Sequence, residues 1–165
     1  MRMLLAALLT VGAVSVAQAQ VRVEDAEVVR RGLYEAGTLT TIDDDSISTG
    51  HRTTAKKMTF KENATRIVAK DGVVFGLDLV VHGSPRGRTI PVRVIWRYPE
   101  PGLRNPETRD VKFRDEYQDK QTIGVESTYY WTLGAEWTRV PGDWTFELWY
   151  NGRMLTSKTF TLVKE

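Results

Sequence analysis

Residues 144–163, WTFELWYNGRMLTSKTFTLV, decide the fold of this chain. In the first half, Trp144, Phe146 and Leu148 occupy every second position, and mostly polar residues occupy the positions between them. Such alternation is typical of a strand with one packed face. The central pair Asn151-Gly152 suits a two-residue type I′ turn, because both central residues of that turn need positive φ. The stretch therefore predicts a tight β-hairpin.

The second strand of this hairpin cannot be regular. Leu155 and Phe160 lie five positions apart, and an odd spacing places two side chains on opposite faces of a regular strand. A β-bulge near Ser157 or Lys158 brings both apolar side chains to the core.

Three earlier segments alternate in the same way and predict strands with one buried face. Their inward parities are Val73, Phe75, Leu77, Leu79 and Val81; Ile90, Val92, Val94, Trp96 and Tyr98; and Ile123, Val125, Tyr129, Trp131 and Leu133. Turn residues rich in Gly and Pro separate them at 82–85, 99–102 and 141–143.

The N-terminal part is less regular. Residues 28–39 predict a strand interrupted at Gly32 and Gly37, and residues 65–70 a second, short one. Residues 43–57 are polar and predict a long loop, and the charged segment 104–121 predicts an edge strand or a turn of helix.

These elements predict an all-β fold. About seven to eight short strands, evenly spaced turns and no strongly amphipathic helix favour an immunoglobulin-like antiparallel β-sandwich. A small closed β-barrel is the alternative, because the same alternation fills a barrel interior.

The first residues predict export. Arg2 precedes an apolar run over residues 3–16, and Ala17-Gln18-Ala19 then supplies the small residues of a cleavage site, which is the pattern of a secretory signal peptide. We expect residues 1–19 to be removed, leaving 20–165 as a single periplasmic or secreted domain that starts at Gln20. A transmembrane anchor needs about 20 apolar residues, more than this run offers.

Composition excludes several classes of function. The chain has no cysteine, so disulfide and thiolate chemistry are excluded. Its formal net charge is +2, and loss of Arg2 lowers it by one. A nearly neutral domain lacks the basic field on which nucleic-acid binding depends.

A series of short motifs resembles a known bacterial family. The motifs are Gly32-Leu33-Tyr34-Glu35-Ala36-Gly37, Ser48-Thr49-Gly50, Phe75-Gly76, Ile90-Pro91 with Trp96 and Pro99, Gly102, Asn105-Pro106, and Pro141-Gly142-Asp143-Trp144. In this order, over residues 28–163, they resemble the domain of unknown function 3859 (DUF3859). The resemblance implies a β-sandwich architecture and a bacterial origin, and it supplies no activity and no catalytic residues.

No residue pattern predicts a metal, a cofactor or a catalytic centre. The run Asp43-Asp44-Asp45-Ser46 offers oxygen ligands, but adjacent residues point in different directions and the spacing of a calcium loop is absent. A solvated acidic loop is therefore the better interpretation. His51 and His82 lack partners at zinc-like spacing, and no nucleophile elbow surrounds Ser48. Paired carboxylates gathered from separate strands stay an open possibility.

A binding surface is the remaining candidate site. Tyr130 and Trp149, with Ile95, fall on parities that are otherwise polar. If their strands adjoin, they form an exposed aromatic platform for a sugar ring, a peptide or another protein. The turn carrying Arg86 and Arg88 is a second candidate, because guanidinium groups suit an anionic polymer.

The sequence therefore predicts an exported, non-catalytic binding or structural module for a protein or an envelope polymer. The alternative is a small hydrolase that acts on an envelope polymer. A deep pocket with convergent Asp, Glu or His favours the hydrolase, and a flat aromatic face favours binding.

Overall fold

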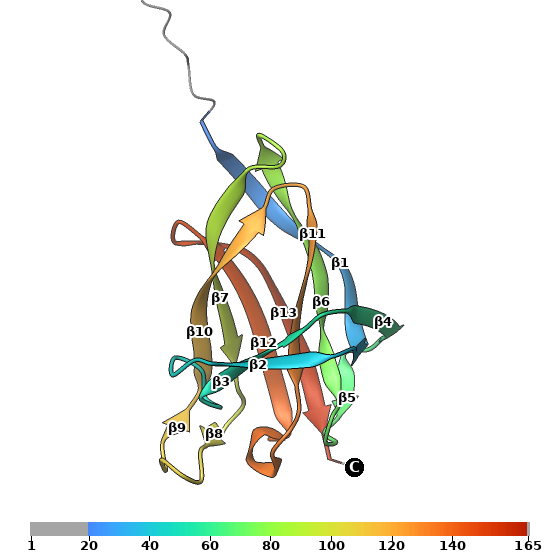
Figure 1. Cartoon of the computed structure of the whole chain (residues 1–165), viewed down its shortest axis with the longest axis vertical. Helices are drawn as coiled ribbons and strands as arrows, with labels where there is room; N and C mark the ends of the chain where they lie inside the picture. The colour runs from blue at the N-terminus through green and yellow to red at the C-terminus, as the bar shows by residue number, and fades with distance from the viewer. Residues whose placement is uncertain (1–19, 165) are drawn as a thin grey trace, which may run out of the picture.

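The computed structural model describes residues 20–164, and its regular secondary structure is almost entirely β-strand (Figure 1). The strands are β1 (Arg22–Ala36), β2 (Leu39–Asp43), β3 (His51–Ala55), β4 (Met58–Asn63), β5 (Arg66–Val68), β6 (Val74–Ser84), β7 (Thr89–Arg97), β8 (Leu103–Arg104), β9 (Val111–Lys112), β10 (Arg114–Thr122), β11 (Glu126–Thr132), β12 (Gly142–Tyr150) and β13 (Arg153–Val163). One 3₁₀ turn, η1 (Glu136–Thr138), precedes β12. The predicted signal peptide, residues 1–19, lies outside the described residues.

Two sheets build the sandwich. One has the strand order β11-β6-β1-β4 and the other β10-β7-β12-β13-β5, and only the pairing of β13 with β5 is parallel. The two short pairs β2–β3 and β8–β9 are separate. The predicted β-sandwich is confirmed, and the closed barrel is excluded because the described strands fall into separate sheets.

Aromatic side chains fill the space between the sheets. Phe75, from β6, meets Trp96, Trp144 and Phe160 of the opposite sheet edge-on, with ring centroids 5.8, 5.9 and 5.2 Å away. The four side chains are at most 1% exposed. The predicted inward parities of β6, β7 and β12 are thus confirmed. In the third predicted segment, which contains β11, Val125 was predicted to face inward but is 50% exposed, because it lies in the turn before β11 begins.

The closing hairpin is confirmed, with its bulge at a different residue. Asn151 and Gly152 have φ of 47° and 78°, as the type I′ turn requires. Leu148 faces Thr156 and Trp149 faces Met154, so the extra residue is Leu155. The prediction of a bulge near Ser157 or Lys158 was wrong: Leu155 turns inward next to the hairpin turn, and the remainder of β13 stays regular.

The N-terminal half holds more strand than its sequence predicted. Residues 43–57 were predicted as a loop, yet they contain most of a hairpin formed by β2 and β3. Its side chains lack the alternation of a half-buried strand, because β2 is exposed along its whole length and β3 is at most half-buried. The predictions of a short strand at 65–70 and of an edge strand within 104–121 are confirmed by β5 and β10.

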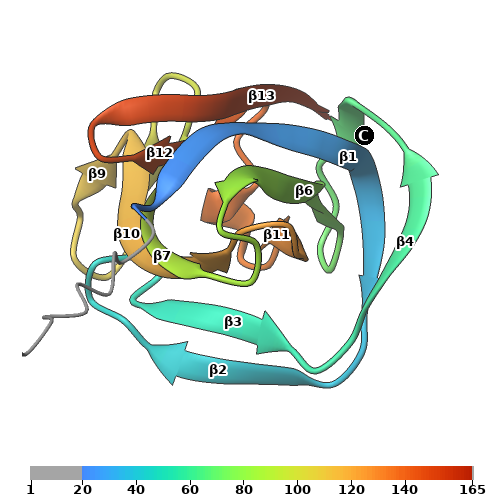
Figure 2. The ribbon, with the colours of Figure 1, turned by 90° about the horizontal axis from the view of Figure 1, so that it is seen from above.

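The β2–β3 hairpin, hereafter the roof hairpin, lies outside both sheets. Seen from above, it crosses one side of the molecule next to β6 and β11 (Figure 2). β11 and β10 are the edge strands of their sheets, and the roof hairpin contacts both of them through Tyr130 and Asp115. It therefore spans the open side of the sandwich. No helix among the described residues is long and apolar enough to cross a membrane.

Candidate functional site

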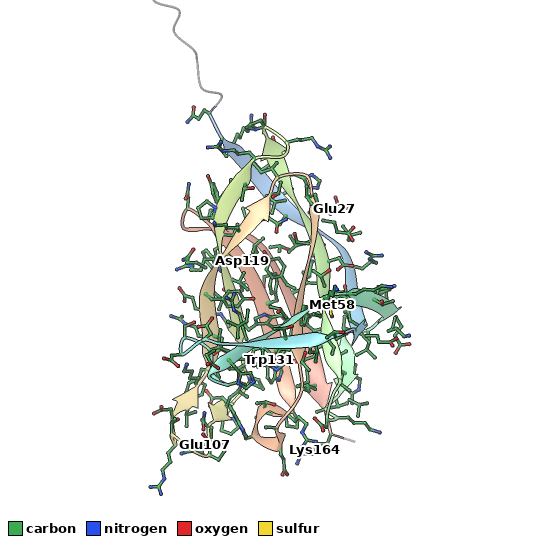
Figure 3. All side chains as sticks on the ribbon, viewed as in Figure 1. Glu27, Met58, Glu107, Asp119, Trp131 and Lys164 are labelled. Atoms are coloured by element: carbon green, nitrogen blue, oxygen red, sulfur yellow. The ribbon has the colours of Figure 1, made fainter. Side chains whose placement is uncertain are left out.

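A cleft of about 490 Å³ lies between the roof hairpin and the two edge strands. Its lining comes from residues 47–54, from β10 and the core beside it (Trp96, Tyr117, Asp119, Lys120, Gln121), and from Ser127 to Thr132 of β11. Figure 3 labels Trp131 and Asp119, which come from the two edge strands. We call this space the edge cleft.

Five aromatic side chains line the edge cleft: Trp96, Tyr117, Tyr129, Tyr130 and Trp131. Burial raises the pKa of the three phenols, Tyr117, Tyr129 and Tyr130, so none ionises near neutral pH. Tyr129 donates its hydroxyl to Gln121 Oε1 at 3.3 Å. The cleft thus presents neutral aromatic surface with a few fixed dipoles, which is typical of ligand sites.

Two buried polar atoms of the lining residues have neither a hydrogen bond nor an ion pair in the described chain, whereas a third, Arg52 Nε, lies 3.2 Å from Asp44 Oδ2. The Trp131 indole Nε1 and the Thr132 Oγ1 make no hydrogen bond within residues 20–164. An unpaired buried polar group costs about 1–3 kcal/mol, so such groups are rare in folded proteins. They follow each other on β11, so their side chains point to opposite faces of the strand, and both residues line the cleft.

The roof hairpin is held at its middle by Tyr130. The phenol oxygen accepts a hydrogen bond from Ala55 N at 2.7 Å and donates to Thr53 O at 3.1 Å. Tyr130 is half-buried, so it is not part of an open platform. It fixes the roof of the edge cleft.

The tip of the roof hairpin is held on β10. Asp115, only 1% exposed, accepts hydrogen bonds from Ser48 N at 2.8 Å and from the Ser48 hydroxyl. The Arg52 guanidinium lies 5.1 Å from the Tyr117 ring centroid, a cation–π distance. Ile47 is buried beside them. These contacts make the roof a fixed part of the site.

The charged side chains of the cleft are Arg52, Asp119 and Lys120, with His51 beside them. Asp119 Oδ1 accepts a hydrogen bond from Lys120 N at 2.8 Å. No hydrogen bond or ion pair joins Asp119 to His51 in the described part of the chain, and residues 20–164 contain no group of three or more metal-ligating side chains.

The acidic run before the roof tip has a structural role. Asp44 Oδ1 accepts hydrogen bonds from Ser46 Oγ at 2.5 Å and Ser46 N at 3.1 Å. The bond from the Ser46 hydroxyl is the main cause that lowers the pKa of Asp44. Its carboxylate is thus engaged in the turn that leads into β3.

The structure separates the two aromatics predicted to form one platform. Tyr130 lies on β11 and Trp149 on β12, in different sheets, so that prediction was wrong. Ile95 is only 3% exposed because it lies between Glu116 and Glu147 on the neighbouring strands, whose charged groups cover it.

Trp149 belongs to a polar network on the outer face of its sheet. Its indole donates to Glu147 Oε2 at 2.8 Å, and Arg93 lies 5.2 Å from its ring centroid. Arg97 donates to Glu147 Oε1 at 2.5 Å, and Arg93 pairs with Glu116 at 3.3 Å. The groups of this face therefore satisfy one another.

The arginine turn lies apart from the edge cleft. Arg86 and Arg88 are exposed on the connection between β6 and β7, and neither lines the cleft. Arg86 Nη2 donates to Gly124 O at 3.3 Å. The five predicted surface residues thus occupy three different places, and only Tyr130 reaches the cleft.

Sequence reasoning missed Trp131, Thr132, Tyr117 and Arg52 as site residues. One signal was present: residues 127–132 read STYYWT, with aromatic residues on both parities. A strand with one wet face does not need this pattern, whereas a strand contacted on both faces does. The cover on its second face, the roof hairpin, was predicted as a loop.

Comparisons with known proteins agree with this architecture. The profile of the family described as a domain of unknown function (DUF3859) matches residues 22–162. An immunoglobulin-like protein from Pseudomonas aeruginosa, known from a crystal structure, is similar with a TM-score of 0.57 and 21% identity, covering 89% of this chain and 99% of that one. At this identity the likeness shows the fold. None of the curated proteins matches the chain.

Proposed function

The chain belongs to the family described as a domain of unknown function, DUF3859, and on that premise we propose that it is an exported, non-catalytic module that binds its ligand in the edge cleft. One observation carries the proposal: an aromatic cleft of about 490 Å³ retains two buried polar atoms, Trp131 Nε1 and Thr132 Oγ1, without partners in the described chain. A ligand that displaces the side chains around these atoms would supply the missing partners and offset their cost.

The chemistry of the cleft supports binding over hydrolysis. Asp119 is the single carboxylate among its described lining residues, whereas glycoside hydrolysis in its usual form uses two. His51 also lines the cleft, but within residues 20–164 no hydrogen bond joins its imidazole to Asp119 or to a hydroxyl, and the Thr49 hydroxyl donates to the His51 backbone carbonyl instead. A base that is not oriented toward a nucleophile offers little for acyl transfer. These observations favour a non-catalytic module.

The proposed compartment rests on the first residues of the sequence. Arg2, the apolar run and Ala17-Gln18-Ala19 form a signal-peptide pattern. A cysteine-free sandwich suits an oxidising compartment, because it has no thiol to oxidise. The ligand source is accordingly the bacterial envelope or its surroundings.

Nuclear magnetic resonance of the mature domain tests the proposal. Isotope-labelled protein is titrated with size-fractionated envelope extract, and the indole N–H signals of its five tryptophans are followed. An active fraction is expected to shift the Trp131 indole and the amides of residues 127–132. The replacement Trp131→Phe keeps an aromatic ring, removes the donor and lowers apparent affinity about tenfold.

A matched control uses the other face. Trp149→Phe also removes an indole donor, but that donor already bonds to Glu147, so ligand affinity is expected to stay the same. Shifts centred on Trp149, or equal affinities for the Trp131→Phe variant and the native protein, contradict the proposal.

A further inference from the structure

The free edge of β11 carries backbone groups without partners. Leu133 donates its N–H to Val73 O at 2.8 Å, which sets the phase of the antiparallel ladder with β6. Because successive residues alternate in direction, Trp131 and Tyr129 point their backbone groups at β6. Thr128, Tyr130 and Thr132 therefore direct theirs away from β6, into the edge cleft.

Nothing in the described chain satisfies this edge. Apart from the ladder with β6, no hydrogen bond reaches the backbone of residues 126–132 within the part of the chain that the structure describes. The contacts of the roof hairpin go to the Tyr130 side chain, and its backbone stays free. An edge of this kind is a template for another strand.

The facing edge strand is different. Tyr98 donates to Phe113 O and Ile123 donates to Arg88 O, so the same alternation directs the N–H of Lys120 away from β7. The Asp119 carboxylate accepts that N–H at 2.8 Å. A side chain thus occupies part of the β10 edge, and β11 is the edge on which a strand can be added.

The shape of the cleft matches an extended chain. Six consecutive residues of β11, Ser127 to Thr132, line it, and at about 3.3 Å per residue they span about 20 Å. A strand beside β11 alternates its side chains. One set meets the rings of Tyr117, Tyr129 and Trp131, and the other set faces the roof hairpin.

We propose that the ligand of the edge cleft is an extended peptide segment that hydrogen-bonds to the backbone of Thr128, Tyr130 and Thr132 as an added strand. This inference rests on the proposed function and names its ligand class. Main-chain pairing supplies affinity in such complexes, and side-chain pockets supply selectivity.

The charges of the cleft limit which peptide sequences it accepts. Arg52, Lys120 and Asp119 line it, and Arg52 also pairs with Asp44 at 3.2 Å. These two cations and two carboxylates balance, so the lining favours a neutral guest over a strongly charged one. The expected guest is a segment of about four to six residues with apolar residues at alternate positions.

A random-peptide display library selected on the mature domain supplies the probe. The selected sequence is synthesised and its affinity is measured against Thr132→Pro and Thr132→Val. Both replacements lose the same hydroxyl, but only proline loses the edge N–H, and proline is tolerated where the missing N–H faces away from the ladder. We expect the proline variant to bind about tenfold more weakly than the valine variant, with equal melting temperatures showing that both fold.

The backbone of the peptide gives a second, independent readout. Peptides methylated at one backbone nitrogen at a time are expected to lose binding at every second position. Only alternate N–H groups of an added strand point at its neighbour. Recognition through side chains alone produces no such period.

Several results overturn the inference. The first is equal affinity of the proline and valine variants, and the second is a methylation profile without period two. The third is a library that yields no peptide able to compete with the envelope fraction that shifts the Trp131 signal. The fourth is an oligosaccharide that binds in the cleft instead. If binding still depends on Trp131 in any of these cases, the proposed function stands and only the ligand class is wrong. If ligand binding does not depend on Trp131 at all, both the proposed function and the ligand class are wrong.

Discussion

Tyr130 on β11 accepts a hydrogen bond at 2.7 Å from the backbone N–H of Ala55, which lies 75 residues earlier on the roof hairpin. One phenol thus connects an edge strand of the sandwich with a hairpin that belongs to neither sheet. The position of the roof over the edge cleft depends on this side chain and on the Ser48–Asp115 contact at the hairpin tip.

Removing the Tyr130 hydroxyl loosens the roof. In Tyr130→Phe the ring stays, but Ala55 N and Thr53 O lose their partner. We expect the free energy of unfolding to fall by about 1 kcal/mol and hydrogen exchange to accelerate in residues 51–55. Tyr150→Phe is the control, because the Tyr150 hydroxyl makes no hydrogen bond within residues 20–164. Unchanged exchange in the hairpin counts against this role.

Trp144 anchors one end of the core. It is 0% exposed, its indole donates to Val140 O at 2.9 Å, and its ring lies 4.7 Å from that of Tyr98. Trp144→Ala is expected to cost about 3–5 kcal/mol, the range for deleting a buried large aromatic, as measured by chemical denaturation. Trp144→Phe should cost clearly less. A loss below about 1 kcal/mol for the alanine variant is incompatible with this burial.

Glu147 makes stability depend on pH. Burial raises the pKa of Glu147, but hydrogen bonds from Arg97 and Trp149 outweigh it and hold the pKa below its ordinary 4.5. The folded protein thus prefers the ionised form, so this stabilisation is present above pH 4.5 and is lost as the pH falls through the lower folded pKa. Glu147→Gln should lose about 1 kcal/mol at neutral pH.

The difference between the native protein and Glu147→Gln should shrink when unfolding is measured below pH 4.5, where the unfolded carboxyl is already protonated. A difference that stays constant across this range shows that the carboxylate charge contributes nothing.

Gly76 permits β11 to lie against β6. A Cβ at this position would lie 2.1 Å from Tyr129 O and 2.7 Å from the Tyr130 Cα, so the neighbouring backbone must move. Gly76→Ala should therefore cost about 1–3 kcal/mol and weaken ligand binding, since it displaces the strand that carries the free edge. Gly134→Ala is the control, because its Cβ would meet nothing within 4 Å. Equal melting temperatures for both variants contradict the expectation.

If the chain is exported as proposed, we expect Gln20 to be its first residue. The pattern Ala17-Gln18-Ala19 places cleavage after Ala19, and intact-mass measurement of the protein secreted or released from the periplasm checks it. A chain that retains Met1 in the membrane fraction excludes the signal-peptide interpretation.

Alternation made the sandwich predictable, and its absence hid the site. Trp144 and Phe75 were placed correctly because one face of each strand meets a dry core, and burial imposes period two. Most of the roof hairpin was predicted as a loop because it is largely exposed, so no burial pattern marks it.

The parity of Tyr130 was also interpreted incompletely. Tyr130 was predicted to be exposed because its position points outward. The roof hairpin, which lies far from Tyr130 in the sequence, covers it. Parity assigns a face to a residue, and only the tertiary arrangement shows what covers that face. The bulge at Leu155 illustrates the same limit, because parity required an extra residue without fixing its place.

The roof hairpin also bears on how copies of this protein behave toward one another. An uncovered strand edge invites unlimited sheet growth between molecules. Here the open edge of β11 borders a cleft of about 490 Å³ beneath the roof hairpin, and we expect this hairpin to hinder a whole neighbouring sandwich from aligning with the edge while it admits a single chain. On that expectation, the hairpin that shapes the cleft also protects the edge from pairing between copies of the protein.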